Sequence, residues 1–379
     1  MELNHLREEI DRIDTQLADL LVRRMHTVAQ VTQAKKESGR DVRDPARERN
    51  IINRVTEQSG DELAPYIKTM FKTMFGLSRN YQKQKMNVIS PLGNRLQQLL
   101  ANPASLSLPN RATVACQGTE GAYAQQACEK MFEYPSILYF NGFNDVFSAV
   151  EKGMCAYGIL PLENSTAGSV TQVYDLMEQH HFHIVGACKL RIDHCLMRKR
   201  NASGPILKIV SHEQALRQCN NYLETLKGVQ IKAMDNTAVA AEYVAYGNDD
   251  SVAVIASPAC AELYDLQIEQ QNISNVQNNF TRFICIARDM QCYPDASKVS
   301  IMFHLPHAPG ALSEIISRLS LAGVNLTKLE SRPIPGREFE FRFFFDFECN
   351  MHDPAMIDLI CELENNTENF VFLGAYAER

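Results

Sequence analysis

The sequence predicts a multidomain protein: an all-α domain, a two-lobed α/β domain and an α+β domain with the ferredoxin-like order βαββαβ. The chain of 379 residues is too long for one ordinary core and fits two or three domains of roughly 100 to 200 residues each. Apolar residues repeat at helical intervals through residues 1–90, whereas strand-like runs alternate with helical stretches from residue 111 onward. A polar stretch that contains prolines separates the two patterns.

Composition and charge exclude several classes of protein. Apolar residues make up 45% of the chain and charged residues 22%, which is typical of globular proteins. The net charge of −7 is spread along the chain, so we expect no nucleic-acid partner. Because Met1 leads directly into charged helical sequence, and no run of about 20 apolar residues follows, we expect neither a secretion signal nor a membrane span. The predicted location is the cytoplasm.

The eleven cysteines and ten histidines form no recognisable framework. The closest cysteine pairs, Cys188/Cys195 and Cys285/Cys292, are seven residues apart, and no Cys-x-x-Cys occurs. We therefore expect reduced, mostly buried thiols. No histidine pair has metal-ligand spacing with a nearby cysteine or carboxylate, so no metal is expected.

Residues 1–90 are expected to form an all-helical domain. From Leu3, apolar residues recur every three or four positions to Val31, and neither proline nor glycine occurs before Gly39, which predicts one long helix. A breaker at Asp44-Pro45 precedes a second helix over residues 47–57, and a third is expected over residues 63–84.

Basic residues of the first predicted helix could bind an anion. Arg24 and Lys35 are eleven residues apart, which places them within about 20° of each other and about 16 Å apart along the axis. Arg7 lies about 25 Å further up the helix and could share a small ligand with Lys35 only if it came from a second chain. A plain solvated helix face is the alternative.

Three segments carry a resemblance to the all-helical class of chorismate mutases. They are Leu6-Arg7-Glu8, residues 23–35 and the string Val42-Arg43-Asp44-Pro45-Ala46-Arg47-Glu48-Arg49. The resemblance implies that this domain rearranges chorismate to prephenate, with Arg47 as a supporting cation. It implies a set of substrate-binding residues, of which Lys35 and Gln82 are also catalytic: Arg7, Arg24, Lys35, Asp44, Glu48, Ser78 and Gln82.

These residue types suit a [3,3] rearrangement that breaks a C–O bond and builds negative charge on the ether oxygen. Arg7 and Arg24 would bind the two carboxylates, and Lys35 and Gln82 would donate hydrogen bonds to the oxygen, which is electrostatic catalysis without a cofactor. Arg7 would cross from a partner protomer, so a homodimer is implied.

Residues 91–110 are expected to connect two domains, because residues 90–110 hold three prolines among polar and small residues. Residues 111–290 are expected to form an α/β domain with parallel sheets. Five of its motifs lie where a predicted strand ends or a predicted helix begins, which is where α/β proteins bind ligands. They cover residues 118–123, 161–165, 211–216, 236–241 and 279–283.

Each motif alone could be a turn or a helix cap, but in this order they resemble prephenate dehydratases over residues 113–288. Thr281-Arg282-Phe283 is the most specific element. The resemblance implies that Thr281 is catalytic and donates a hydrogen bond to the leaving hydroxyl of prephenate, without a cofactor. Arg282 is a candidate partner for a substrate carboxylate. The other implied substrate-binding residues are Asn164, Ser165, Thr166, Ser211, Gln214 and Thr237.

Two positions depart from that family's pattern. Glu213 stands where proline usually follows the histidine, and its charge is favourable at a helix start. Ala124 stands where a hydroxyl residue often follows the tyrosine, and a lost hydroxyl contact there could weaken substrate binding.

Residues 298–379 are expected to form the βαββαβ domain, with helices over residues 309–322 and from residue 354. Residues 309–313 and 330–333 resemble motifs of ACT regulatory domains. This implies that L-phenylalanine binds between paired domains and shifts the dehydratase to a less active state. A domain that only dimerises is the alternative. The implied effector-binding residues are Gly310, Ala311, Leu312, Glu330, Ser331 and Arg332.

The three resemblances together predict a feedback-inhibited bifunctional chorismate mutase and prephenate dehydratase, which forms a homodimer or a tetramer of paired dimers. Two other functions stay open at this point. One is a dehydratase with a catalytically silent helical dimeriser, and the other is a carboxylate-binding receptor without catalysis. The oxidative branch is disfavoured because no Gly-x-Gly-x-x-Gly follows a predicted strand.

Overall fold

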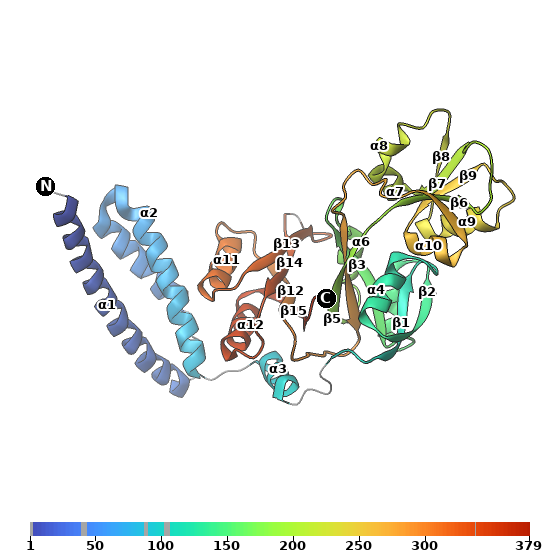
Figure 1. Ribbon diagram of the computed structural model, residues 1–379. Helices are drawn as coiled ribbons and strands as arrows, with labels where there is room; N and C mark the ends of the chain where they lie inside the picture. Colours follow the sequence, from blue (N-terminus) through green and yellow to red (C-terminus); the bar gives the residue numbers. More distant parts are fainter. Residues whose placement is uncertain (1–2, 39–43, 87–89, 102–106, 338) are drawn as a thin grey trace. The chain divides into compact units, whose positions relative to one another are not determined.

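The computed structural model describes residues 3–38, 44–86, 90–101, 107–337 and 339–379 (Figure 1). The chain divides into two compact units, Met1–Asn94 and Arg95–Arg379. The first unit contains the predicted helical domain, and the second contains both the α/β domain and the βαββαβ domain. Gly39, and Val42 and Arg43 of the mutase-like string, lie outside the described residues.

Two long helices build the first unit. α1 (Leu3–Ser38) is continuous, as predicted. α2 (Pro45–Met86) is interrupted at Gly60, where φ is 70° and ψ is 161°, and Figure 1 shows the chain turning back within α2. Glycine suits this point because a side chain disfavours a positive φ. The two halves of α2 therefore correspond to the second and third predicted helices.

The segment expected to connect two domains contains a helix, α3 (Pro91–Ala101). Ser90 Oγ accepts a hydrogen bond from Gly93 N at 3.0 Å and caps the helix, and Pro91 takes a position where an N–H would have no helical partner. The apolar residues at 96–100 give this short helix one face to bury, and Leu96 is fully buried. The role of residues 91–110 as a connection between domains stays a prediction.

The first lobe of the α/β domain is a six-stranded sheet in the order β2-β1-β3-β11-β5, with β4 paired to β3. β1 is parallel to β2 and β3, whereas β11 is antiparallel to β3 and β5. The expected parallel sheet is therefore wrong, because β11 returns from the second lobe in the opposite direction. The elements are β1 (Arg111–Gln117), α4 (Tyr123–Met131), β2 (Tyr134–Phe140), α5 (Phe143–Glu151), β3 (Tyr157–Asn164), β4 (Gly168–Ser169), α6 (Thr171–Leu176), β5 (His183–Arg191) and β11 (Phe280–Ala287).

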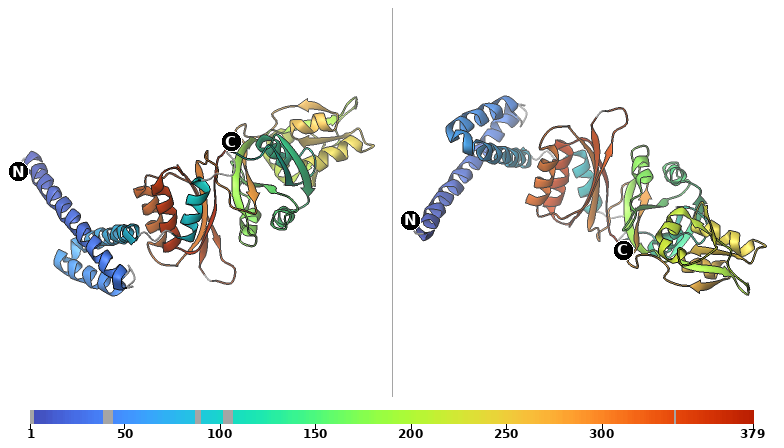
Figure 2. Two further views of the ribbon diagram at one scale, coloured as in Figure 1. Left: turned by 90° about the horizontal axis from the view of Figure 1, so that it is seen from below. Right: turned by 90° about the horizontal axis from the view of Figure 1, so that it is seen from above.

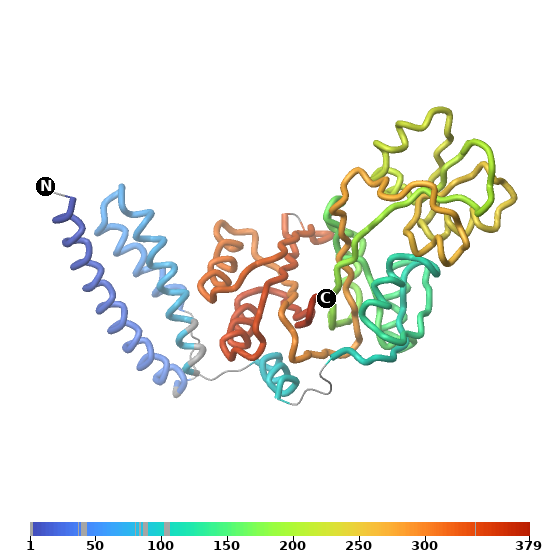
Figure 3. Tube along the Cα trace, in the orientation of Figure 1, coloured from blue at the N-terminus to red at the C-terminus, as the bar shows by residue number. Residues whose placement is uncertain are grey.

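The second lobe is a five-stranded mixed sheet in the order β10-β6-β9-β7-β8. The chain enters it after β5 and leaves it before β11, so two crossings join the lobes (Figure 3). The elements are β6 (Cys195–Lys199), β7 (Lys208–His212), α7 (Glu213–Gln218), α8 (Asn220–Leu223), β8 (Gln230–Met234), α9 (Thr237–Tyr246), β9 (Val252–Ala256), α10 (Pro258–Leu263) and β10 (Leu266–Gln270).

The C-terminal domain has the predicted βαββαβ order and an antiparallel sheet in the order β13-β14-β12-β15. Its two helices cover one face of the sheet, and the other face is turned to the first lobe (Figure 2). The elements are β12 (Lys298–Leu305), α11 (Ala311–Leu321), β13 (Leu326–Pro333), β14 (Phe341–Glu348), α12 (Pro354–Asn366) and β15 (Glu368–Tyr376).

The C-terminal sheet and the first lobe share one hydrophobic core. Phe344 of β14 packs edge-to-face on Tyr174 of α6, with ring centroids 4.9 Å apart, and both belong to one buried cluster. Beyond β15 the backbone follows β5: Ala187 N donates to Ala377 O at 3.1 Å, and Arg379 N donates to Ala187 O at 2.8 Å. The C-terminal domain is therefore docked on the α/β domain by both side chains and backbone.

Candidate active sites

A cleft of about 790 Å³ lies between α1 and α2. Arg7 does not line it and is exposed on α1. One chain thus brings together every residue predicted for the mutase site except the one assigned to a partner chain. The predicted residues that line the cleft are Arg24, Lys35, Asp44, Glu48, Ser78 and Gln82.

The lining of this cleft carries four basic and two acidic side chains. The difference is two positive charges, which is electrostatically complementary to a dianion. The basic residues include Arg47, as expected, and Arg79, which sequence analysis missed. The charged residues are Arg24, Lys35, Arg47, Arg79, Asp44 and Glu48.

Polar contacts fix several of these side chains. Arg24 Nη1 donates to Ser78 Oγ, and burial lowers the pKa of Arg24. Glu48 Oε1 accepts a hydrogen bond from Arg79 Nη1 at 2.6 Å. Asp44 Oδ1 accepts from Arg47 N at 3.0 Å and so caps α2. Arg79 precedes Gln82 by one helical turn, a spacing that could have identified it.

Gln82 is buried, with 7% of its surface exposed. Its Nε2 donates to Ser78 O at 3.3 Å, while its Oε1 is buried without a hydrogen-bond partner among the described residues. A buried amide with unused hydrogen-bonding capacity is costly in a folded protein unless a ligand completes it.

A second cleft, of about 590 Å³, lies between the two lobes of the α/β domain. The β3–β4 turn of the first lobe contributes Thr166, α7 of the second lobe contributes Gln214 and Gln218, and the segment after β10 contributes Asn275 and Asn279. Residues of both lobes therefore face one space.

A hydrogen-bonded chain leads from Thr281 into this cleft. Asn164 Nδ2 donates to Thr281 Oγ1 at 2.9 Å and to Asn279 Oδ1 at 2.7 Å. Thr166 Oγ1 donates to Asn164 Oδ1 at 2.7 Å, and Gln218 Nε2 donates to Thr166 Oγ1 at 3.1 Å. Because Thr281 Oγ1 accepts from an amide, its own proton is directed elsewhere.

Sequence analysis did not select two residues of this series of hydrogen bonds. Gln218 lies one turn after the predicted Gln214 on the same helix, and Asn279 lies two residues before Thr281. Spacing of four on a helix and of two along an extended segment places side chains on one face, so both signals were present in the sequence.

Three predicted dehydratase residues have other contacts. Ser211 is fully buried, and its hydroxyl donates to Ile255 O at 2.5 Å, joining β7 to β9. Ser165 Oγ accepts from Phe280 N at 2.9 Å. Thr237 begins α9, which is capped by Asn236 rather than by Thr237. Like Thr281 and Asn164, none of the three is among the residues that line the interlobe cleft, and their expected part in substrate binding stays a prediction.

The two departures from the family pattern have different outcomes. Glu213 opens α7, lines the cleft and forms an ion pair of 2.5 Å with Arg217. Ala124 is buried in the core beneath α4, so a hydroxyl there would face the core rather than the cleft.

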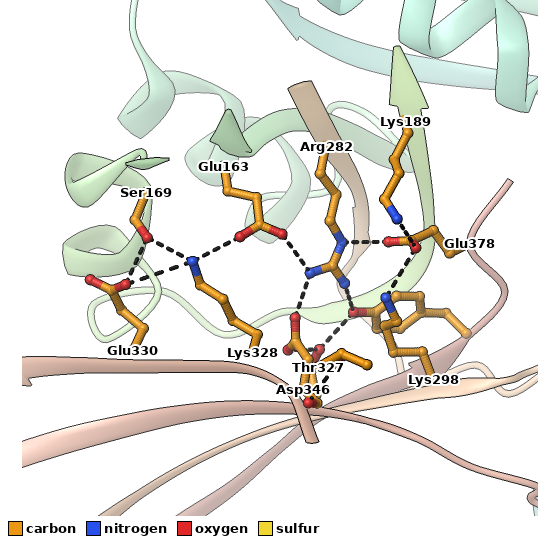
Figure 4. A network of polar contacts seen from close by, with 12 residues as sticks. Glu163, Ser169, Lys189, Arg282, Lys298, Thr327, Lys328, Glu330, Asp346 and Glu378 are labelled. Atoms are coloured by element: carbon orange, nitrogen blue, oxygen red, sulfur yellow. Dashed lines mark hydrogen bonds and ion pairs between the residues drawn. The ribbon is translucent and has the colours of Figure 1, made fainter. Parts of the chain in front are cut away.

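Arg282 contacts the C-terminal domain rather than the interlobe cleft, and its expected contact with a substrate carboxylate stays a prediction. It follows Thr281 on β11, and successive strand residues point to opposite faces. Its guanidinium donates to Asp346 Oδ2 at 2.5 Å and to Tyr376 Oη at 2.6 Å, and its Nε lies 2.7 Å from Glu378 Oε1 (Figure 4). Burial opposes its charge, but Tyr376 and Asp346 raise its pKa.

The predicted effector residues separate into two groups. Gly310, at φ 88°, precedes α11 and is exposed, and Ala311 and Leu312 begin that helix. On β13, Ser331 is exposed, whereas Glu330 accepts from Ser169 Oγ at 2.6 Å and Arg332 donates to Asp175 at 3.0 Å. Glu330 and Arg332 thus contact the first lobe.

All eleven cysteines are described: ten are buried, Cys349 is half-buried, and all are free thiols. Within the described residues, no group of three or more histidine, cysteine, aspartate or glutamate side chains is arranged to hold a metal ion. None of the described helices is long and apolar enough to cross a membrane.

Comparison with known proteins matches three family models to the chain. They are Chorismate mutase type II over residues 6–83, Prephenate dehydratase over residues 114–291 and ACT domain over residues 299–365. The models follow one another in the order of the helical, α/β and βαββαβ domains. The chain therefore combines a mutase, a dehydratase and a regulatory domain.

Individual relatives and a solved structure are similar to the chain over the same domains. The bifunctional chorismate mutase/prephenate dehydratase of Escherichia coli K12 is 32% identical over 98% of this chain and 95% of its own length. Arogenate dehydratase/prephenate dehydratase 2 of Arabidopsis thaliana is 36% identical over 72% of this chain and 74% of its own. The solved prephenate dehydratase of Arthrobacter aurescens, in complex with L-Phe, is 25% identical over 70% of this chain and 89% of its own, with a TM-score of 0.63. This chain belongs to the family of bifunctional chorismate mutase/prephenate dehydratases.

Proposed function

We propose that the chain converts chorismate to prephenate in the α1–α2 cleft and prephenate to phenylpyruvate in the interlobe cleft, and that L-phenylalanine inhibits the second step through the ACT domain. One observation carries the proposal: a single chain holds two separate clefts, one lined by the predicted mutase residues and the other joined to Thr281 by a chain of hydrogen bonds. The proposed boundaries are 1–90 for the mutase, 111–290 for the dehydratase and 298–379 for the ACT domain, with 91–110 between the catalytic domains.

In the mutase site, Arg24 and a partner's Arg7 bind the two carboxylates of chorismate. Lys35 and Gln82 donate hydrogen bonds to the ether oxygen as the C–O bond breaks and negative charge develops there. Gln82 suits this role because only one of its two amide protons is used by Ser78 O. Asp44, Glu48 and Ser78 complete the polar lining.

The partner that supplies Arg7 is a second copy of this chain. α1 presents apolar side chains at helical spacing that are 43% to 57% exposed, and such a stripe is covered in stable helical assemblies. Burying it against the same stripe of another copy gives a homodimer, and pairing of ACT domains would extend the dimer to a tetramer. The stripe consists of Leu6, Ile10, Ile13, Leu17 and Leu20.

In the dehydratase site, the Thr281 hydroxyl donates a hydrogen bond to the leaving hydroxyl of prephenate. Asn164 holds the threonine oxygen as an acceptor, so the threonine proton points to substrate. Carbon dioxide departs from the ring carboxylate, its bonding electrons enter the ring as it becomes aromatic, and the departing hydroxide takes up a proton to become water. Gln214, Thr166 and Gln218 line the space for substrate, and Arg217 lines it as a cation for a carboxylate.

L-phenylalanine is the proposed effector because the related Arthrobacter aurescens prephenate dehydratase was solved with L-Phe. Gly310, Ala311, Leu312 and Ser331 offer exposed or half-buried positions for it. The cytoplasm is the proposed location because eleven free thiols suit a reducing compartment. Neither reaction requires a cofactor.

The test follows chorismate consumption and phenylpyruvate formation by the wild type, Lys35→Ala and Thr281→Ala, each with and without phenylalanine. We expect Lys35→Ala to lose only the first step and Thr281→Ala to accumulate prephenate. Lys36→Ala, on the exposed neighbour of Lys35, and Thr281→Ser, which keeps the hydroxyl, are the matched controls.

Two results would overturn the proposal. If the wild type left chorismate untouched but dehydrated prephenate, the helical unit would be a silent dimeriser. If neither acid reacted, the chain would be a carboxylate receptor.

A further inference from the structure

The ends of β3 and β11 each carry one residue of the proposed dehydratase site and one charged residue, of which Arg282 is buried and Glu163 is half-buried. Thr281 pairs in register with Asn164, and Arg282 pairs with Glu163. Because neighbouring strand residues point to opposite faces, Thr281 and Asn164 belong to the dehydratase site, while Arg282 and Glu163 face the ACT domain (Figure 4). Each strand therefore joins the site to the ACT domain through adjacent residues.

The Arg282 connection is fixed at its far end within the ACT sheet. Asp346 of β14 receives Arg282 on one carboxylate oxygen and Ser300 Oγ of β12 on the other, at 2.5 Å each. Ser300 Oγ also lies 2.7 Å from Tyr376 Oη, which accepts from Arg282. Three strands of the ACT domain thus hold the guanidinium, and its side chain is only 3% exposed.

Lys328 of β13 forms a second connection, to β3 and β4. Its ammonium lies 2.7 Å from Glu163 Oε2 and donates to Ser169 Oγ at 2.9 Å. Ser169 in turn donates to Glu330 at 2.6 Å. Ser169 pairs with Glu163 across the β3–β4 turn, and that turn carries Thr166 at the interlobe cleft. β13 therefore contacts the turn that carries Thr166 at the interlobe cleft.

The two connections belong to one balanced network of four cations and four anions. Buried charges keep their partners because an uncompensated charge is costly in a low dielectric. A displacement of β14 would consequently move Arg282 with Asp346, and a displacement of β13 would move Lys328 and, with it, Glu163 and Ser169. The network comprises Lys189, Arg282, Lys298, Lys328, Glu163, Glu330, Asp346 and Glu378.

We propose that Arg282 and Lys328 are positioning residues through which the ACT domain sets the geometry of the Thr281–Asn164 pair. The inference rests on the proposed function of Thr281 and deepens it: it names the contacts by which effector binding reaches the dehydratase site. An effector that favours a different arrangement of β13 and β14 shifts Arg282 and Lys328, and with them the threonine hydroxyl and the β3–β4 turn.

If the network only stabilised the fold, its loss would lower stability without changing kcat. The variant Arg282→Lys distinguishes this structural role from a positioning role. Lysine keeps the charge but cannot hold Asp346, Tyr376 and Glu163 with a planar fork. We expect the kcat of dehydration to fall about 10- to 100-fold with KM little changed, because a small misplacement of a catalytic group has this effect. In a Thr281→Ala background the same substitution should add almost nothing, because Arg282 acts through Thr281.

Lys328→Met tests the regulatory half. We expect the phenylalanine concentration for half inhibition to rise about tenfold, which equals about 1.4 kcal/mol of lost coupling. Glu178→Gln is the matched control, since it removes the partner of Arg342 on the same strand β14 without touching β3 or β11. The control should leave kcat and the phenylalanine response close to wild type, and the mutase rate should be unchanged in every variant.

The inference is overturned if Arg282→Lys lowers the unfolding temperature but leaves kcat and the phenylalanine response intact. It is also overturned if the losses from Arg282→Lys and Thr281→Ala multiply, or if Glu178→Gln behaves like Arg282→Lys. If Arg282→Lys fails to fold, Glu163→Gln at the edge of the network is measured instead. We expect it to lower the kcat of dehydration by less than about 10-fold but measurably, and an unchanged kcat would overturn the inference. Failure of the proposed function is recognised separately, because the wild type itself would then form no phenylpyruvate.

Discussion

The α1–α2 cleft and the interlobe cleft are completed in different ways. In the helical unit, the polar residues gather in one chain but Arg7 stays outside, and neighbouring Leu6 and Ile10 are 43% and 56% exposed. In the dehydratase domain, Thr281 and Asn164 lie on strands whose reverse faces are buried against the ACT domain. On the proposal that Arg7 comes from a partner, the first site is completed by a second copy of the chain, whereas the second site is supported by another domain of the same chain.

Because of this difference, the two activities should be sensitive to changes at different interfaces. A site completed by a second copy depends on association and on the exposed α1 face. A site supported by a docked domain depends on the contacts between β5, β11 and the ACT sheet, whatever the state of the helices. Perturbations of the two interfaces should therefore affect the two reactions separately.

The largest expected effect is at Gly374 of β15. A Cβ at this position would lie 2.0 Å from Ile184 O on β5, so Gly374→Ala must push the ACT domain away from the first lobe. We expect a loss of at least about 3 kcal/mol in the stability of this unit and loss of dehydration, with the mutase reaction retained. Gly76→Ala, in open space on α2, should instead stabilise its helix by up to about 1 kcal/mol. Thermal unfolding, together with the mutase and dehydratase assays, tests both variants.

Arg7→Ala should lower the mutase rate about 100-fold, because a carboxylate loses its cation, and leave dehydration intact. Mixing Arg7→Ala with Lys35→Ala chains sharpens the comparison. Half of randomly mixed dimers contain both chains, and each of these has one intact site, so about one quarter of wild-type activity should return. If mixing restores nothing although the chains exchange, Arg7 acts within its own protomer.

Gln218→Leu should lower kcat/KM for prephenate about tenfold, an effect of about 1.4 kcal/mol. The substitution removes the bond from Gln218 to Thr166, which links the lobes at 3.1 Å. Gln230→Leu, exposed on β8 of the same lobe, is the control and should change little. Steady-state kinetics with prephenate decides, and equal effects of the two substitutions would contradict a role for the Gln218 contact.

Local periodicity predicted the order of elements well, because α1 and the βαββαβ domain are patterned by their own residues. It failed where a second segment decides the outcome. The direction of β11 depends on where the chain returns from the second lobe, so the sheet proved mixed rather than parallel. The apolar patch around Leu96 became a helix because a buried environment is available to it.

The sites show the same division. Helical spacing placed Arg24 and Lys35 on one face of the first helix, and the resemblance added Gln82 from another helix; all three line the α1–α2 cleft. The sequence did not predict the buried partners of Arg282, because Asp346 and Glu378 lie far along the chain. Strand alternation could have warned that Thr281 and Arg282 do not share a face, but not what lies on the second face.

The smallest expected effect is a pH dependence at the edge of the ACT interface. Burial alone would raise the pKa of Glu163, but Lys328 and Arg282 hold it below its ordinary value. A carboxyl whose pKa is lowered by folding stabilises the protein above its unfolded pKa, and the contribution disappears as the pH falls through the folded pKa. At pH 7 the free energy of unfolding of the wild type should therefore exceed that of Glu163→Gln by about 1 kcal/mol, and this difference should shrink as the pH falls below about 4.3, the ordinary pKa of a glutamate. The control Glu213→Gln, in an exposed ion pair, should have a free energy of unfolding close to that of the wild type at any pH. If the difference between the wild type and Glu163→Gln persisted in acid, the charge of Glu163 would not be what stabilises the interface.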